Sequence, residues 1–260
     1  MKGLVIVITM ALVLINVVVY AYDVNEIPMV FVKGGCFEMG DTLGHGRQEE
    51  RPVHQMCLKD FSIGQYEVTQ GLWKEVMGDN PSYFKLGDNY PVDNVSWSNI
   101  QTFIERLNTM AGKKYNLPTE AQWEYACRGG GKNVKYAMPA NKKGSLSDYA
   151  WYDGKSTHPV GQKRPNGLGI HDMSGNVWEM IRDVYNKDAY ESHGMGDHVQ
   201  EGTGNTYVIR GGGWYGYPRG LRCSDRAYHS SVFGCSTVGF RLVLETDVPQ
   251  QEKSTRHPGN

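Results

Sequence analysis

The segment Asp172-Met-Ser-Gly-Asn-Val-Trp-Glu179 lies within a long, largely irregular stretch, residues 131–205, that is rich in glycine, asparagine, aspartate and tyrosine. A stretch of that length stays ordered only if bound ions or dense hydrogen bonding satisfy its backbone. The segment offers two carboxylates around a glycine-containing turn that can aim carbonyls inward, and calcium prefers such mixed oxygen ligands. By its residues alone, however, a solvated acidic turn is the simpler interpretation.

Helices are predicted before this stretch. Thr69 is a cap-like residue at the start of a short amphipathic helix, and residues 98–101 (Ser-Asn-Ile-Gln) have the form of a capping box for a second helix that runs to Gly112. Residues 118–122 (Pro-Thr-Glu-Ala-Gln) hold another capping box, which opens a helix that residues 129–130, both glycine, must stop.

Short strands flank these helices, so the sequence predicts an α+β fold with much irregular structure. The strand-like runs are residues 29–32, 37–39, 56–58, 61–63, 207–210, 214–215 and 239–243. No internal repeat and no Pro/Ser-rich linker divides the body of the chain. We therefore interpret residues 25–244 as one domain and residues 245–260 as a polar C-terminal tail.

Composition argues against nucleic acid as a partner. The chain has 27 basic and 28 acidic side chains, without a Lys/Arg run that would release counterions from a phosphate backbone. Its 32 glycines favour turns and loops over a helical bundle.

The N-terminus predicts export. Residues 4–19 are apolar except for Thr9 and Asn16, they follow a basic start, and a cleavage site is expected after Ala21. Residues 1–21 therefore resemble a signal peptide, which predicts a protein of the periplasm, the cell surface or the medium with no membrane span after cleavage. An uncleaved membrane anchor is the alternative.

The cysteines fit no C-x-x-C zinc or redox pattern, and their odd number leaves at least one thiol unpaired in an oxidising compartment. A Cys223–Cys235 bridge and a pair of buried inert thiols are equally open. The five cysteines are Cys36, Cys57, Cys127, Cys223 and Cys235.

Six segments, in this order, resemble the sulfatase-modifying-factor (formylglycine-generating enzyme) family across nearly the whole body of the chain. The resemblance implies a C-type-lectin-like α+β domain. The segments are residues 37–40 (FEMG), 67–69 (EVT), 91–97 (PVDNVSW), 117–125 (LPTEAQWEY), 172–179 (DMSGNVWE), and 210–214 (RGGGW) together with 239–241 (GFR).

The resemblance implies a structural calcium ion. Family members bind calcium at the positions that match the side chains of Asp172 and Glu179 and the carbonyls of Gly175 and Val177. Better-known members have asparagine where this chain has Asp172, and the added charge should strengthen the attraction for the cation.

The same resemblance exposes a missing feature. Members that make formylglycine carry two cysteines shortly after a Gly-Gly-Ser-aromatic sequence, and these thiolates bind copper. Here the first such position falls at Gly216, residues 216–222 contain no cysteine, and Cys223 cannot supply both ligands. We expect neither copper nor formylglycine chemistry. The scattered histidines also lack metal-ligand spacing.

The segment before the final Gly-Phe-Arg has the composition of a binding surface, because tyrosine, tryptophan and arginine give large contact area at small entropic cost. It is also similar to the region that retroelement-diversified bacterial variable surface proteins of this fold alter. Ordinary loop composition is the alternative interpretation. The candidate ligand-binding residues are Trp214, Tyr215, Tyr217, Arg219, Asp225, Tyr228, His229, Ser230 and Phe233.

Two hypotheses for function follow. The first is an exported, non-catalytic domain that binds a protein or small-molecule ligand through residues 214–237. The second is an oxidase of the wider family that uses a metal site other than the missing cysteine pair.

Overall fold

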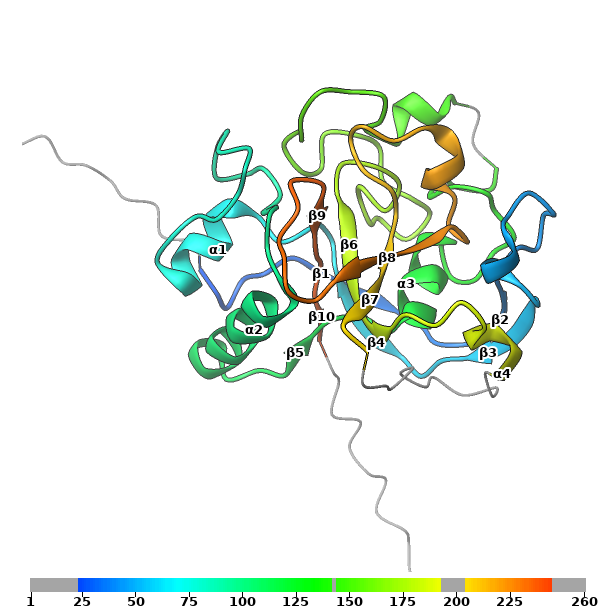
Figure 1. Ribbon diagram of the computed structural model, residues 1–260, viewed down its shortest axis with the longest axis horizontal. Helices are drawn as coiled ribbons and strands as arrows, with labels where there is room; N and C mark the ends of the chain where they lie inside the picture. Colours follow the sequence, from blue (N-terminus) through cyan, green and yellow to red (C-terminus); the bar gives the residue numbers. More distant parts are fainter. Residues whose placement is uncertain (1–22, 142–143, 193–203, 245–260) are drawn as a thin grey trace, which may run out of the picture.

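The computed structural model describes residues 23–141, 144–192 and 204–244 (Figure 1). The predicted signal peptide and polar tail lie outside the described residues. Within the described part of the chain, none of the helices combines the length and the apolar character that a membrane crossing requires.

The strands form three sheets in the described residues, and the fold is α+β as predicted. Figure 1 shows the β6–β8 sheet in the middle of the molecule, α1 and α2 at one end, and the β2–β3 hairpin with α4 at the other. The sheets have the orders β1 (Met29–Val32)–β4 (Phe61–Gly64)–β10 (Val243–Leu244)–β5 (Tyr115–Asn116), β2 (Cys36–Met39)–β3 (His54–Cys57), and β8 (Arg226–Ser230)–β7 (Thr206–Arg210)–β6 (Trp178–Val184)–β9 (Val238–Gly239). Strands β6 and β9 are parallel, and the other pairs are antiparallel.

The helices begin at polar caps. Thr69 caps α1, and its side chain accepts a hydrogen bond from the Leu72 amide at 3.2 Å. Thr119 and Gln122 form the predicted reciprocal capping box of α3. The helical elements are α1 (Gln70–Met77), α2 (Trp97–Ala111), α3 (Glu120–Cys127), α4 (Ala189–Ser192) and the 3-10 helices η1 (Gln48–Glu50), η2 (Leu146–Asp148) and η3 (Pro218–Leu221).

Three local predictions were wrong. The run at residues 239–243 is not one strand, because β9 ends at Gly239 and β10 begins at Val243 in another sheet. The N-cap of α2 is Ser96, two residues before the predicted cap, Ser98. The Ser96 hydroxyl accepts a hydrogen bond from the Asn99 amide, and the Asn99 side chain accepts one from the Ser96 amide, both at 3.2 Å. Helix α2 ends at Gly112, as predicted, in the left-handed region (φ 62°). The predicted strand at Trp214 and Tyr215 is instead a turn between β7 and η3.

Two disulfides join distant parts of the chain. Cys36 pairs with Cys57 across the β2–β3 hairpin, and Cys127, the last residue of α3, pairs with Cys223. Both interpretations of Cys223 and Cys235 are therefore wrong, because Cys223 returns to the end of α3 and finds its partner there. Cys235 is the free cysteine of the described residues, which confirms that one thiol stays unpaired.

Candidate functional site

An aromatic loop follows β7 and exposes several of the predicted binding residues. Tyr215 and Tyr217 are 48% and 73% exposed, and the Arg219 side chain is also on the surface. A second group lies on β8 and the turn after it, where Tyr228 and Phe233 are 59% and 69% exposed. We call these five residues the contact face.

Three other predicted binding residues are half-buried and support the loops. The Trp214 indole donates to the Ser236 carbonyl at 3.3 Å, which joins the two halves of the contact face. His229 Nε2 lies 2.8 Å from the Phe233 carbonyl, and the Ser230 hydroxyl accepts from the backbone at 3.3 Å. These contacts hold the loop that carries Phe233.

Sequence reasoning missed two aromatic side chains beside the loop. The Phe84 ring lies edge-on to Trp214 at 5.3 Å, and Tyr83 contacts Phe84 at 4.9 Å and is 71% exposed. Both aromatics stand just before the family segment that starts at Pro91. Two adjacent aromatic residues in a short turn were the feature of the sequence that could have indicated this position.

Asp93 holds this neighbouring turn. Its carboxylate accepts hydrogen bonds from the amides of Tyr83 at 2.7 Å and Phe84 at 3.4 Å, and its own amide donates to Ser82 Oγ at 3.2 Å. Burial raises the pKa of Asp93 to about 6, against the two amide hydrogen bonds, which lower it.

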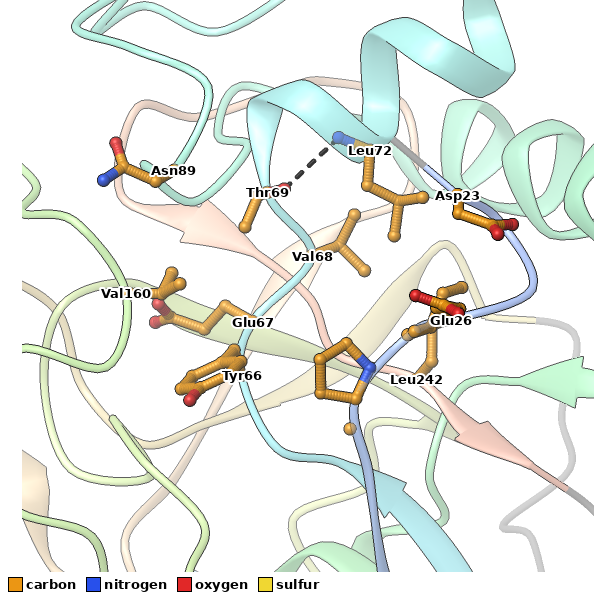
Figure 2. Close-up of a pocket in the computed structure, with 13 residues that line it drawn as sticks. Asp23, Glu26, Tyr66, Glu67, Val68, Thr69, Leu72, Asn89, Val160 and Leu242 are labelled. Atoms are coloured by element: carbon orange, nitrogen blue, oxygen red, sulfur yellow. Dashed lines mark hydrogen bonds between the residues drawn. The ribbon is translucent and has the colours of Figure 1, made fainter. Parts of the chain in front are cut away.

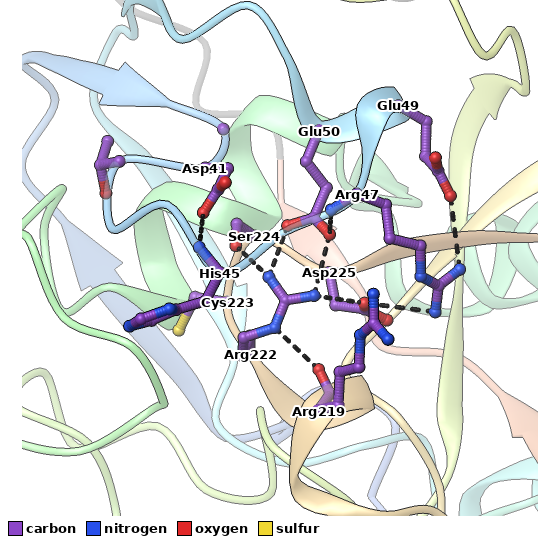
Figure 3. Close-up of polar contacts among 12 residues, drawn as sticks. Asp41, His45, Arg47, Glu49, Glu50, Arg219, Arg222, Cys223, Ser224 and Asp225 are labelled. Atoms are coloured by element: carbon purple, nitrogen blue, oxygen red, sulfur yellow. Dashed lines mark hydrogen bonds and ion pairs between the residues drawn. The ribbon is translucent and has the colours of Figure 1, made fainter.

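Beneath the contact face, Arg222 is buried in an ion-pair network (Figure 3). Its guanidinium donates to both carboxylate oxygens of Glu50, at 2.6 and 2.8 Å, and to Asp225 at 2.8 Å. Asp225 also lies 3.5 Å from Arg47. Asp225 is 0% exposed, so its place among the predicted ligand-contacting residues is wrong: it supports the face from below.

The network has opposite effects on the pKa values of its two carboxyl groups, Glu50 and Asp225. Burial opposes ionisation of Glu50, but hydrogen bonds, above all from Arg222, outweigh it and lower its pKa. Burial raises the pKa of Asp225 to about 6 even though Arg47 and Arg222 favour its charged form. Glu50 is therefore the main counter-charge of Arg222.

Two further buried arginines fix the backbone of the same segment. Arg210 donates to the three carbonyls of residues 223–225 at 2.8 to 2.9 Å and forms an ion pair with Glu124. Arg226 binds Glu120 through two hydrogen bonds, at 2.8 and 2.7 Å. Residues 222–226 thus form a rigid base between the two exposed halves of the contact face.

The position of the family's cysteine pair contains no thiols. Gly216 lies in the aromatic loop, where its carbonyl accepts from the Asp153 amide at 3.0 Å. Cys223 is committed to its disulfide with Cys127, and the Cys235 sulfur lies 3.1 Å from a threonine hydroxyl. The described residues therefore place no two free thiols together.

The predicted calcium segment lies at the start of β6. Glu179 is 0% exposed and forms a two-point ion pair with Arg241, both distances being 2.6 Å. It also accepts from the Trp123 indole at 2.7 Å. Its carboxylate would have to be shared between these donors and a metal ion.

Asp172 offers a more available oxygen. One carboxylate oxygen accepts from the Gly161 amide at 2.7 Å, whereas the other is buried without a hydrogen-bond partner. Glu67, which sequence reasoning missed, binds the turn through the Asn176 side chain at 2.7 Å and the Val177 amide at 3.2 Å. Burial, and then repulsion from other carboxylates, raises the pKa of Glu67 well above its usual range.

The donor chemistry around Asp172 suits a hard cation. Three buried carboxylates, those of Glu67, Asp172 and Glu179, face the guanidinium of Arg241. One carboxylate oxygen is also unsatisfied. In the described residues, no three His, Cys, Asp or Glu side chains are arranged to hold a metal. Because the predicted site also uses the carbonyls of Gly175 and Val177, calcium stays a prediction.

Comparison with known proteins identifies the family. The sulfatase-modifying factor enzyme 1-like domain matches residues 21–246. The chain belongs to this family. It is 32% identical over 237 residues to the chaperone protein LppX of Paenibacillus barcinonensis, covering 72% of this chain and 78% of that protein. It is 28% identical over 287 residues to the formylglycine-generating enzyme of Streptomyces coelicolor, covering 84% and 90%.

Among solved structures, this sulfatase-modifying-factor member is similar to Treponema denticola variable protein 1. The TM-score is 0.75 at 27% identity, and the match covers 84% of this chain and 95% of that chain. Both predicted resemblances, to the formylglycine-generating enzyme family and to variable proteins of its fold, are therefore confirmed. The chain has the fold and the ordered motifs of the family, but it has no pair of cysteines shortly after Arg210-Gly-Gly-Gly-Trp214.

Proposed function

We propose that this family member is an exported, non-catalytic domain that binds a protein or small-molecule ligand through the contact face. The observation that carries the proposal is a set of exposed aromatic and arginine side chains on two segments, the aromatic loop and β8 with its following turn, that flank a base of buried ion pairs. Such side chains dominate binding energy in interfaces, and a rigid base reduces the entropy lost on binding.

Two observations support export and the absence of formylglycine chemistry. The disulfides Cys36–Cys57 and Cys127–Cys223 suit an oxidising compartment and agree with the predicted leader. Soft copper(I) selects thiolates, and the thiol nearest to the family position, Cys223, is oxidised.

We further propose that calcium braces the turn at Asp172, through the side chains of Asp172 and Glu179 and the carbonyls of Gly175 and Val177. The unsatisfied Asp172 oxygen and the excess of carboxylates over guanidinium support this. Calcium would supply positive charge and additional oxygen coordination, which would help to order the irregular stretch.

Site-specific photocrosslinking tests the contact face. Benzoylphenylalanine replaces Tyr215 or, as a matched control, Met110 on α2, which is 47% exposed. Cells that export the protein are irradiated, and a captured partner is then purified for direct affinity measurement. We expect a product from position 215 that is absent from position 110 and is lost with Tyr217→Ser and Arg219→Ser. Equal products at both positions would contradict the proposal.

The oxidase alternative is tested on the same protein. The protein, loaded separately with copper and with iron(II), is incubated with a cysteine-containing peptide while oxygen uptake is followed against metal-only controls and aldehydes are trapped with a hydrazine. We expect no enzymatic oxygen uptake and no aldehyde, and either signal would overturn the non-catalytic proposal. A neighbouring reverse-transcriptase gene with a near-copy of the codons for residues 214–237 would identify a diversified variable protein.

A further inference from the structure

A cavity of about 340 Å³ lies beside the start of α1 (Figure 2), and none of the contact-face residues lines it. It is enclosed by the chain after residue 22, the end of β4, the start of α1, and single residues from three other segments. Its volume falls in the range of small-molecule sites. The lining residues are Asp23, Glu26, Ile27, Pro28, Gly64, Tyr66, Glu67, Val68, Thr69, Leu72, Asn89, Val160 and Leu242.

The walls are largely apolar and locally fixed. Val68 and Leu72 line one side, and the hydrogen bond from the Leu72 amide to Thr69 holds this part of the wall. Val160 closes another side, where its amide donates to the Asn89 carbonyl at 2.9 Å. A preformed apolar cavity of this kind favours a ligand with an apolar body.

The charged groups of the lining are acidic and lie at the rim. Asp23 and Glu26 are exposed at the rim, whereas Glu67, whose raised pKa favours its neutral form, belongs to the inner wall. The described lining contains no lysine, arginine or histidine. In Figure 2, Glu26 and Glu67 lie on opposite sides of the cavity. The two rim carboxylates, Asp23 and Glu26, therefore attract cations and repel anions at the cavity mouth.

We propose that this cavity binds small organic cations with an apolar body, such as alkylammonium or arylalkylammonium ions. The apolar part would pack against Val68, Leu72 and Leu242, while the ammonium group would remain near Glu26 and Asp23 at the rim, where it keeps part of its hydration. This site is independent of the contact face and of its proposed function.

Hexylammonium and benzylammonium are the probes, and hexanol, benzyl alcohol and hexanoate are their neutral and anionic counterparts. Binding to the full chain is measured by isothermal titration calorimetry and saturation-transfer NMR at pH 7 with 1 mM calcium, so that the calcium site is kept constant. We expect saturable binding of both ammonium ions, weaker binding of the alcohols, and the weakest binding of hexanoate.

Two variants connect the binding to this cavity. Val160→Phe adds volume at a half-buried wall position and should remove binding of all probes, with its fold checked by urea unfolding. Glu26→Gln should weaken ammonium binding about two- to fivefold and leave hexanol binding unchanged. Glu75→Gln, on the exposed side of α1 outside the lining, is the matched control and should change nothing.

The proposal is overturned if neither ammonium ion binds saturably, or if the alcohols or hexanoate bind as tightly as the ammonium ions. It is equally overturned if a folded Val160→Phe variant binds the probes as the unmodified protein does. Should Val160→Phe not fold, the comparison of Glu26→Gln with Glu75→Gln decides, because both substitutions are at exposed positions.

Discussion

The substitution Arg222→Met tests whether buried ion pairs support the contact face. Arg222 is 3% exposed and makes five hydrogen bonds: two to Glu50, and one each to Asp225, the Ser224 hydroxyl and the Arg219 carbonyl. Methionine keeps much of the apolar stem but removes every donor. Glu50, which is 0% exposed, then loses its principal counter-charge.

The expected loss is about 3–5 kcal/mol in the free energy of unfolding, because removing one partner leaves the other charge buried and uncompensated. Most of this cost falls on Glu50, since Asp225, with a pKa of about 6, can become protonated at small expense. For a domain whose total stability is about 5–15 kcal/mol, the loss moves the urea midpoint by about 1–3 M.

Urea unfolding at pH 7, followed by tryptophan fluorescence and circular dichroism with both disulfides intact, measures the loss. Arg219→Met is the matched control: its side chain is exposed, its backbone carbonyl is retained, and the expected change is within about 0.5 kcal/mol. The double variant Glu50→Leu/Arg222→Met should recover part of the loss. If Arg222→Met costs no more than Arg219→Met, the buried base does not stabilise the face.

Three further predictions concern a disulfide, the buried carboxyl group of Asp93 and the predicted calcium site. Replacing Cys127 and Cys223 by alanine should lower the free energy of unfolding by about 3–5 kcal/mol, since the bridge closes a separation of 96 residues; an unchanged urea midpoint would refute this. The pKa of Asp93 is raised to about 6, so its stabilising contribution is complete below the unfolded value near 4 and is lost as the pH rises through 6. The free energy of unfolding of Asp93→Asn minus that of the unmodified protein should therefore increase from pH 4.5 to pH 7.5. A decrease, measured by urea unfolding, would contradict the raised pKa of Asp93. Calcium added after chelation should raise the melting temperature by mass action, and Asp172→Ala should remove that shift in calorimetry.

Local signals in the sequence were sufficient for the elements that depend on neighbouring residues. The capping box of Thr119 and Gln122 positioned α3 correctly, because both hydrogen bonds join residues three apart. The start of α2 was missed by two residues because Ser96 and Ser98 are both serines that can act as an N-cap, and only the hydrogen bonds of Ser96 with Asn99 distinguish them. The ordered motifs gave the family, and hence the fold.

Long-range pairings were not accessible in the same way. Arg222 and Glu50 are separated by 172 residues, and Arg226 and Glu120 by 106, so no local pattern joins them. The same limit explains why Cys127 was not recognised as the partner of Cys223, because 96 residues separate them. Asp225 was assigned to the surface because composition does not distinguish a buried acid from an exposed one.

The order of burial along residues 214–233 separates the residues that stabilise the segment from those that can contact a ligand. Buried residues 222–226 stand between exposed side chains on both sides, so the residues that stabilise the segment are not those that face solvent. Substitution at Tyr217 or Phe233 should change the free energy of unfolding by no more than about 0.5 kcal/mol, whereas Arg222 carries the larger cost. In a segment divided in this way, the exposed side chains of this chain can be exchanged without removing the ion pairs that fix its backbone.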